Sequence, residues 1–285
     1  MSKDLAASVR ARLLNKAKAE QSDFNAVLVR YALERLLYRM SQSAHADSFL
    51  LKGAMLFTLW YDMPHRPTRD VDLLGFGPSD LASINKTFKD IASVVVDDGI
   101  SFEPESVSAQ EIRQEAGYAG ARVLISAELA GAQVKTQVDI GFGDAVTPGP
   151  VRAVYPVMLD DFPAPILQTY PVYTVIAEKL HAIALLGMTN SRLKDYLDIS
   201  VLLERETLDT EILASAIAAT FKRRGLAVPT ELPIGLSDEF ANDASRQALW
   251  RAFLKKNQLA VTPLLTIVIT LRERLTIALK LAAGQ

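Results

Sequence analysis

The stretch that decides the fold is residues 50–74, LLKGAMLFTLWYDMPHRPTRDVDLL. It opens with apolar residues that lead into Lys52 and Gly53, continues in a pattern typical of a helix, and is then broken by two prolines. It closes with Asp70 and Asp72 inside an apolar strand pattern. Residues two apart on a strand point to the same face, and two carboxylates there are costly unless a cation lies between them. The stretch therefore predicts a divalent metal site.

Composition bounds the class of protein. The chain has 285 residues, 22% of them charged and 49% hydrophobic, and a net charge of -2, so contact with nucleic acid would need a local basic patch. It has no cysteine, which excludes disulfides and thiolate metal sites, and its three histidines argue against a histidine-rich zinc site. Residues 1–20 lack the apolar core of a secretory signal, and no run of about 18 apolar residues predicts a membrane span. We expect a cytoplasmic protein without a membrane partner.

The segments around the opening stretch alternate between helix and strand. Helical spacing of apolar residues predicts helices over 4–19 and 24–40, with Ser22 or Asp23 as the cap of the second. A strand at 49–51, a helix at 54–61, a strand at 70–74 and a helix from 81 to about 95 follow. Residues 97–120 are polar and poorly periodic, with a helical turn expected at 108–114.

Strict alternation then predicts a hairpin. Apolar and polar residues alternate over 121–129 and again over 133–140, with a turn at 130–132. Asp139 lies on the polar face of the second strand. If that strand lies beside 70–74, then Asp70, Asp72 and Asp139 converge on one sheet face, and their hard oxygen ligands suit Mg²⁺ or Mn²⁺.

The second half of the chain is mainly helical. Residues 148–171 are proline-rich and predict connecting structure, and helices are expected over 175–186, 190–205, 210–224, 237–257 and 263–283. The whole pattern indicates an α/β (α+β) protein in which a small mixed sheet is flanked by helices. We expect a first domain over 1–165 and a helical subdomain over 166–285 that completes the active-site cleft.

Five motifs in fixed order resemble one known family. They are Lys52-Gly53-Ala54, Thr68-Arg69-Asp70-Val71-Asp72-Leu73, Asp139-Ile140-Gly141-Phe142-Gly143-Asp144, Glu178-Lys179-Leu180-His181-Ala182 and Arg192-Leu193-Lys194-Asp195-Tyr196-Leu197-Asp198. Together they resemble the AbiEii/AbiGii toxin family, which includes the MenT toxins and consists of nucleotidyltransferases with a polymerase-beta-like fold. The joint occurrence is far more specific than any one motif.

The resemblance implies roles for individual residues. Asp70 and Asp72 would be metal ligands, Lys179 would hold nucleotide phosphates, and Asp198 would be a further acidic residue of the catalytic set. A lysine suits a triphosphate because it is a compact point charge. Asp195 shares a helix face with Asp198, and it either helps to place the nucleotide or belongs to an ordinary ion-paired helix surface.

Three residues of the first motif would form the nucleotide-binding turn. Gly53 would let backbone N–H groups near Ala54 approach phosphate oxygens, and Lys52 lies beside them. Enzymes with this fold generally carry a serine or glycine where this chain has Ala54, so a side-chain contact with phosphate is lost here. Arg66 and Arg69 either contact phosphates or offset the negative charge of the acidic pair.

The expected reaction is metal-dependent transfer of a nucleoside monophosphate from a nucleoside triphosphate, with release of pyrophosphate. By resemblance the acceptor would be an RNA such as a tRNA 3′ end, and the protein would be the toxin of a toxin–antitoxin or abortive-infection pair that acts in phage defence, with a cognate antitoxin or repressor as partner. Two short basic clusters, 222–224 and 255–256, either dock an RNA backbone or are solvated helix ends. The alternatives are transfer to a protein or small molecule, or a catalytically idle relative that binds nucleotide or antitoxin.

Overall fold

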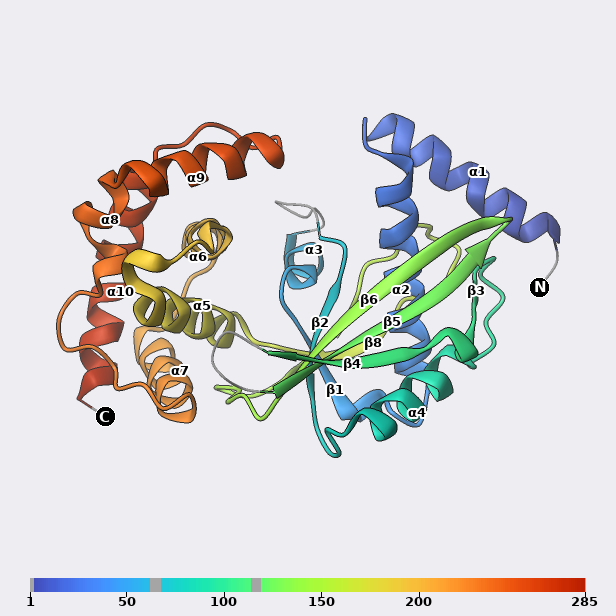
Figure 1. The fold of residues 1–285 in the computed structure, drawn as a ribbon, viewed down its shortest axis with the longest axis horizontal. Coiled ribbons are helices and arrows are strands. Elements are labelled where there is room, and N and C mark those ends of the chain that lie inside the picture. Colours follow the sequence, from blue (N-terminus) through green and yellow to red (C-terminus); the bar gives the residue numbers. More distant parts are fainter. Residues whose placement is uncertain (1–2, 62–67, 114–118, 285) are drawn as a thin grey trace. The chain divides into compact units, whose positions relative to one another are not determined.

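The computed structural model describes residues 3–61, 68–113 and 119–284 (Figure 1). The chain divides into two compact units. The first comprises Met1–Gly143 and Val151–Thr169, and the second comprises Asp144–Pro150 and Tyr170–Gln285. The first unit carries a sheet with flanking helices, so the predicted α/β class is confirmed.

The first unit is built on a mixed sheet. Eight strands are present among the described residues, in the order β3-β5-β6-β2-β1-β8-β7, with β4 also paired to β5. β2 runs parallel to β6 and β1 runs parallel to β8, whereas the other pairs are antiparallel. The strands are β1 Phe49–Lys52, β2 Val71–Gly75, β3 Ser101–Phe102, β4 Ser108–Arg113, β5 Ala119–Leu129, β6 Ala132–Phe142, β7 Val151–Val154 and β8 Ile166–Thr169.

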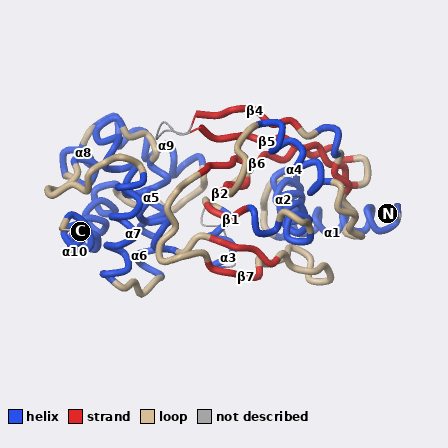
Figure 2. The backbone as a smooth tube through the Cα atoms, turned by 90° about the horizontal axis from the view of Figure 1, so that it is seen from below, coloured by secondary structure: helices blue, strands red, loops and turns tan. Residues whose placement is uncertain are grey.

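Helices cover the apolar side of this sheet. They are α1 Lys3–Ala19, α2 Phe24–Gln42, α3 Met55–Tyr61 and α4 Leu81–Ala92. α2 contacts β6 and β8, α4 contacts β4 and β5, and α2 and α4 also contact each other. Figure 2 shows the strands running side by side with α2 and α4 next to them. Asp23 caps α2 by accepting a hydrogen bond from the backbone N–H of Ala26, which confirms one of the two predicted caps.

The predicted hairpin is confirmed as β5 and β6. Its buried residues alternate along both strands, as Val123, Ile125 and Val138 illustrate. Ala130 and Gly131 have φ values of 48° and 79°, and Leu129 pairs directly with Ala132 across the two-residue turn. Positive φ at both turn positions gives the twist that such short hairpins need. The turn therefore fixes the register of the whole hairpin.

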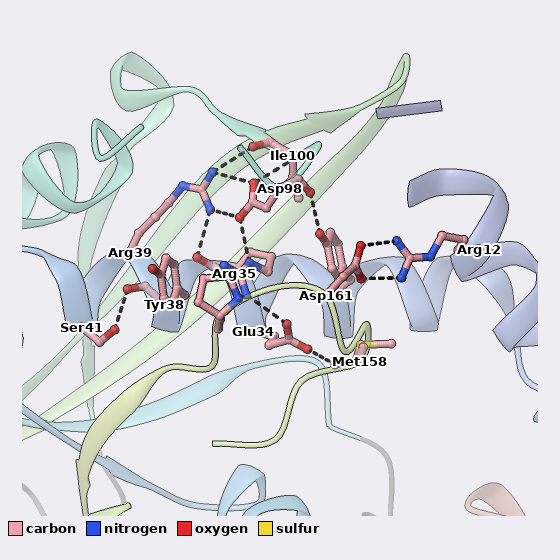
Figure 3. Close-up of polar contacts among 12 residues, drawn as sticks. Arg12, Glu34, Arg35, Tyr38, Arg39, Ser41, Asp98, Ile100, Met158 and Asp161 are labelled. Carbon is pink, nitrogen blue, oxygen red and sulfur yellow. Dashed lines mark hydrogen bonds and ion pairs between the residues drawn. The ribbon is translucent and has the colours of Figure 1, made fainter. Parts of the chain in front are cut away.

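A buried ionic cluster ties α2 to the segment that leads into β3 (Figure 3). Asp98 is fully buried, and its carboxylate accepts hydrogen bonds from Arg35 Nε at 2.7 Å and from Arg39 Nη1 at 2.7 Å and Nη2 at 3.0 Å. Tyr31 donates to the Asp98 carbonyl oxygen. Nearby, Glu34 accepts from the backbone N–H of Met158 at 2.7 Å. Burial raises the pKa of Glu34 to about 7, although the hydrogen bond from Met158 and the neighbouring Arg35 lower it.

The second unit is helical in the part that the structure describes. Its helices are α5 Val172–Leu186, α6 Leu193–Arg205, α7 Thr210–Arg223, α8 Asp238–Asn242, α9 Ala244–Lys256 and α10 Leu264–Ala283. α5 packs on α6 and α7, and α10 packs on α6, α7 and α8. One segment of the described chain, Val172–Thr189, is long and apolar enough to cross a membrane by composition, with a mean hydropathy of 1.2. Of this segment, 39% is buried, and α5 packs on α6 and α7.

Three local predictions differ from the structure. The helical turn expected at 108–114 is strand β4, whose exposed polar side chains hide the alternation of an edge strand. The proline-rich segment 148–171 contains β7 and β8, which are too short to give a periodic signal. The helix expected over 237–257 is divided into α8 and α9, because Asp243 ends the first and caps the second by accepting from Arg246 N–H.

Candidate active site

Four charged residues form one row across the sheet of the first unit. Lys52 on β1 pairs with Asp72 on β2, Asp72 pairs with Asp139 on β6, and Asp139 pairs with Arg122 on β5. Directly opposed residues on neighbouring strands point to the same face, so all four side chains share a face. Their predicted arrangement on one face is thus found for Asp72 and Asp139.

The neighbouring row explains why the charges lie on that face. It consists of Leu51, Leu73, Ile140 and Ala121, which pair in the same order and are all at most 1% exposed. Side chains alternate between faces along a strand, so burying this apolar row turns the charged row to the opposite side. The position of the carboxylates therefore follows from the packing of the core.

Gly53 makes room for the Asp72 carboxylate. Its φ of 74° is in the left-handed region, and a Cβ built at Gly53 would lie 2.0 Å from Asp72 Oδ2. The same Cβ would lie 2.7 Å from Asp72 Cβ and Cγ. Only glycine fits this backbone and this contact without movement. The Lys52-Gly53 motif and the acidic motif are thus parts of one local structure.

Asp139 is held by an arginine. Arg122 Nε donates to Asp139 Oδ1 and Arg122 Nη2 donates to Oδ2, both at 2.8 Å, and Gln137 Nε2 donates to Oδ1 at 3.2 Å. The Asp139 side chain is 15% exposed and that of Arg122 is 34% exposed. The hydrogen bonds to Asp139 raise the pKa of Arg122, and the charges of Asp139, Asp70 and Asp72 add to the shift. All three carboxylates therefore act on this one guanidinium.

Asp70 lies just before β2 and is partly exposed. It accepts a hydrogen bond from Thr68 Oγ1 at 2.6 Å, which orients its carboxylate. Within the ranges that the structure describes, no group of three or more His, Cys, Asp or Glu side chains stands ready to hold a metal ion. The chemistry of the carboxylates fits a divalent cation, because Asp72 and Asp139 are adjacent hard oxygen ligands. What departs from the prediction is that Asp139 is already engaged by Arg122.

The other predicted residues of the first unit have different environments. Lys52 is 9% exposed and Ala54 is 6% exposed, so both belong to the interior. Arg69 is exposed beside the acidic pair. α3 begins at Met55, after Ala54. Arg66 lies outside the described residues.

The second unit brings the other predicted residues together. Lys179 on α5 makes ion pairs of 2.7 Å with Asp195 and with Asp198, both on α6 and both fully buried. Arg192 Nε binds the second Asp195 oxygen at 2.7 Å. Burial opposes ionisation of Asp195, but the charges of Lys179 and Arg192 outweigh it and lower the pKa of Asp195. Asp195 therefore belongs to a buried ionic cluster rather than to a solvated helix surface.

A second buried cluster follows next to it on α5. Arg224 binds Asp144 at 2.9 Å and Glu178 at 3.0 Å, and the Tyr170 hydroxyl donates to Glu178 at 3.2 Å. Arg224 thus turns inward, and only Lys222 and Arg223 remain exposed in the basic cluster that the sequence indicated. His181 packs against Phe221, and burial lowers the pKa of His181 to about 4.

Arg122 is a functional-site candidate that the sequence patterns did not indicate, and Arg224 was indicated only as part of the basic cluster 222–224. The hairpin itself carried a signal for Arg122, because the two-residue turn fixes the register and counting back from it pairs Arg122 with Asp139. The ion pairs of Arg224 with Asp144 and Glu178 carried no comparable signal, since these partners are distant in sequence. Arg224 stands at the end of a helix, where basic residues are common.

Comparison with known proteins identifies the family. Residues 35–273 match the model of the family described as nucleotidyl transferase AbiEii toxin, type IV toxin–antitoxin system. The chain belongs to the AbiEii family. It is therefore a nucleotidyltransferase of the toxin–antitoxin type, and the recognition made from the five motifs is confirmed. The AbiEii family implies a nucleoside triphosphate as co-substrate and a cognate antitoxin.

Two solved structures resemble the chain in fold. JHP933 from Helicobacter pylori is 14% identical with a TM-score of 0.53, and the match covers 91% of this chain and 94% of that one. A candidate nucleotidyltransferase from Helicobacter pylori is 13% identical with a TM-score of 0.51, covering 91% and 96%. At these identities the likeness shows the fold alone. None of the curated proteins matched.

Proposed function

We propose that this AbiEii family member transfers a nucleoside monophosphate from a nucleoside triphosphate to an RNA acceptor, such as a tRNA 3′ end, with the help of Mg²⁺ or Mn²⁺. The observation that carries the proposal is the charged row, in which Asp72 and Asp139 are paired neighbours and Gly53 makes room for the Asp72 carboxylate. Asp70 and Asp72 would hold the metal, with Asp139 as the third carboxylate. The metal would neutralise charge on the triphosphate and activate the acceptor hydroxyl.

Residues of the chain itself would carry the remaining tasks. Lys179 would bind triphosphate oxygens as a point charge, and Asp195 and Asp198 hold its ammonium group in place at 2.7 Å. Lys52 and the exposed Arg69 would add positive charge beside the acidic residues. Positioning of this kind supplies most of the catalysis in phosphoryl and nucleotidyl transfer, because little covalent chemistry is left to the protein.

The choice of RNA as acceptor is supported by α9. The 13 residues of this helix, Ala244–Lys256, include four basic residues and no acidic one. Arg251, Lys255 and Lys256 are exposed, whereas Arg246 is engaged by Asp243 and the Asn190 carbonyl oxygen. An exposed helix that carries positive charge alone is suited to a phosphate backbone. We further propose that the protein acts in the cytoplasm as the toxin of an abortive-infection or phage-defence pair related to the MenT toxins.

A labelling experiment tests the reaction. The protein would be incubated with each α-³²P-labelled nucleoside triphosphate, Mg²⁺ and a mixture of cellular RNA, protein and small molecules. We expect label in RNA that ribonuclease releases and protease does not. Asp72→Asn should abolish the label while the protein stays folded, because a neutral amide binds the cation poorly. Full labelling by Asp72→Asn would refute the proposed site.

The same experiment separates the alternatives. Label released by protease would show a protein acceptor, and label in the soluble pool would show a small-molecule acceptor. Absence of transfer to any acceptor, together with growth arrest that persists in Asp72→Asn, would indicate a catalytically idle protein that acts by binding. Replacing Lys255 and Lys256 by alanine should weaken tRNA binding and reduce its salt dependence, whereas a double Lys222→Ala, Arg223→Ala variant provides the charge-matched comparison on α7.

A further inference from the structure

Arg122 is a cation that is bound by both carboxylate oxygens of Asp139. Two parallel N–H···O hydrogen bonds of 2.8 Å join the guanidinium to both carboxylate oxygens, and Gln137 takes a further position on Oδ1. Bidentate pairs of this kind are among the stronger polar contacts in proteins. Asp139 is therefore occupied from both oxygens in the structure.

We propose that Arg122 takes the cation position beside Asp139 in the metal-free protein, and that divalent metal binding requires its release. This inference rests on the metal-dependent reaction proposed above, and it assigns Arg122 a role as a positioning residue. The observation that carries it is the bidentate pair, in which Arg122 binds both carboxylate oxygens of Asp139.

Charge repulsion explains why the Arg122 guanidinium and a Mg²⁺ ion cannot bind Asp139 at the same time. A Mg²⁺ ion needs an oxygen lone pair at about 2.1 Å, and a guanidinium on the same carboxylate would then lie within a few ångströms of the dication. Repulsion at such distances is large in a partly buried site, because the effective dielectric constant is well below that of water. Asp139 can serve one of the two cations at a time. Arg122, whose side chain is 34% exposed, has solvent beside it into which it can withdraw.

The row also shows what withdrawal would change. With Arg122 in place, the row holds two positive and two negative charges, and Asp70 adds a third carboxylate. Releasing Arg122 leaves Lys52 as the positive member of a row that holds Asp72 and Asp139, so the negative charge available to a dication increases. The metal-free sheet avoids this concentration of like charge because Arg122 compensates it. The Arg122–Asp139 ion pair therefore lowers the metal affinity, because it has to break before the metal binds.

Direct measurement of metal binding tests the inference. Mn²⁺ binding would be followed by electron paramagnetic resonance in the wild type, Arg122→Gln, Arg122→Lys and Asp72→Asn. We expect Arg122→Gln to lower the Mn²⁺ dissociation constant about tenfold, since the competing pair is partly exposed and screened. Arg122→Lys, which cannot form the bidentate pair, should give a smaller gain. Arg152→Gln on β7 is the matched control, because it removes an exposed arginine of the same sheet and should leave the constant unchanged.

The outcomes distinguish this inference from the proposed function. If Asp72→Asn abolishes Mn²⁺ binding and Arg122→Gln binds no tighter than the wild type, the metal site stands and the competition is refuted. Weaker binding by Arg122→Gln would also refute it, and would show that Arg122 supports the ligands. If the wild type binds no Mn²⁺, both the metal site and the inference fail. The Arg122 Nε–H resonance, assigned by its loss in Arg122→Lys, should shift when Mg²⁺ is added, and an unchanged resonance at saturating Mg²⁺ would contradict release.

Discussion

Replacing Gly53 by alanine should damage the active site and the fold together. The new Cβ would lie 2.0 Å from Asp72 Oδ2 and 2.7 Å from Asp72 Cβ and Cγ, so the Asp72 side chain has to move by more than an ångström to reach ordinary contact distances. The backbone of β2 has little freedom to follow, because Val71, Leu73 and Leu74 are buried. The carboxylate would therefore leave the position that its partners in the charged row share.

The magnitude follows from two separate costs. The φ of 74° costs an alanine about 1 kcal/mol relative to glycine. Overpacking of a tight site typically adds about 1–3 kcal/mol. We expect the unfolding free energy of Gly53→Ala to fall by roughly 2–4 kcal/mol in urea denaturation. Nucleotidyl transfer should fall by about 100-fold or more, because a displacement near an ångström has this effect on reacting groups.

Gly131→Ala is the matched control for the backbone cost. Gly131 has a φ of 79°, close to that of Gly53, but a Cβ there meets no atom within 4 Å. This variant should lose about 1 kcal/mol of stability and keep full transfer activity. The reasoning would be refuted if both variants lost the same stability and Gly53→Ala retained transfer. A smaller loss of stability from Gly53→Ala in an Asp72→Ala background would assign the remaining cost to the carboxylate.

Three further predictions concern the buried charges. Asp98→Asn should lower the unfolding free energy by about 3 kcal/mol, because Arg35 and Arg39 keep their charge without the buried carboxylate, and a loss below about 1 kcal/mol would contradict this. Burial raises the pKa of Glu34 from 4.5 to about 7, so the folded protein binds this proton more tightly than the unfolded chain. Stability should then fall as the pH rises from 4.5 to 7, by up to about 3 kcal/mol, and Glu34→Gln should flatten this dependence in denaturation measured across that range. Lys179→Met should lower both the melting temperature and transfer, since it leaves two buried carboxylates without their shared partner, and an unchanged melting temperature would argue against the ion pairs.

The sequence predicted those features of the fold that leave a periodic pattern. The alternation over the β5–β6 hairpin and the place of Asp72 on a strand follow from the two-residue period of strands, and the structure has both. Asp70, predicted on the same strand, lies one residue before β2 begins. β4 and β7 were missed because they are edge strands whose side chains are largely exposed, so no apolar alternation marks them. These two segments form strands because they pair with neighbouring strands, and their own residues do not show that pairing.

The candidate site shows the same division. The family motifs indicated which carboxylates and which lysine to consider, and the structure adds their partners. The sequence of α5 could not predict that Lys179 belongs to a buried ionic cluster. Its partners Asp195 and Asp198 lie on α6, which packs against α5. The pairing of Arg122 with Asp139 depends on strand register, which becomes definite only once the hairpin turn is known.

The charged row has a consequence for changes in chain length. Each of its four members stands next to an apolar residue of the buried row, so inserting or deleting one residue within a strand exchanges a charge for an apolar side chain on both faces at once. A substitution in the row can be absorbed by its neighbours, whereas a change of register moves a charge into the core and removes it from the site. We therefore expect the lengths of β1, β2, β5 and β6 to constrain this protein more strictly than the identity of most residues within them. Exposed connections such as 77–79, between β2 and α4, are places where length can vary.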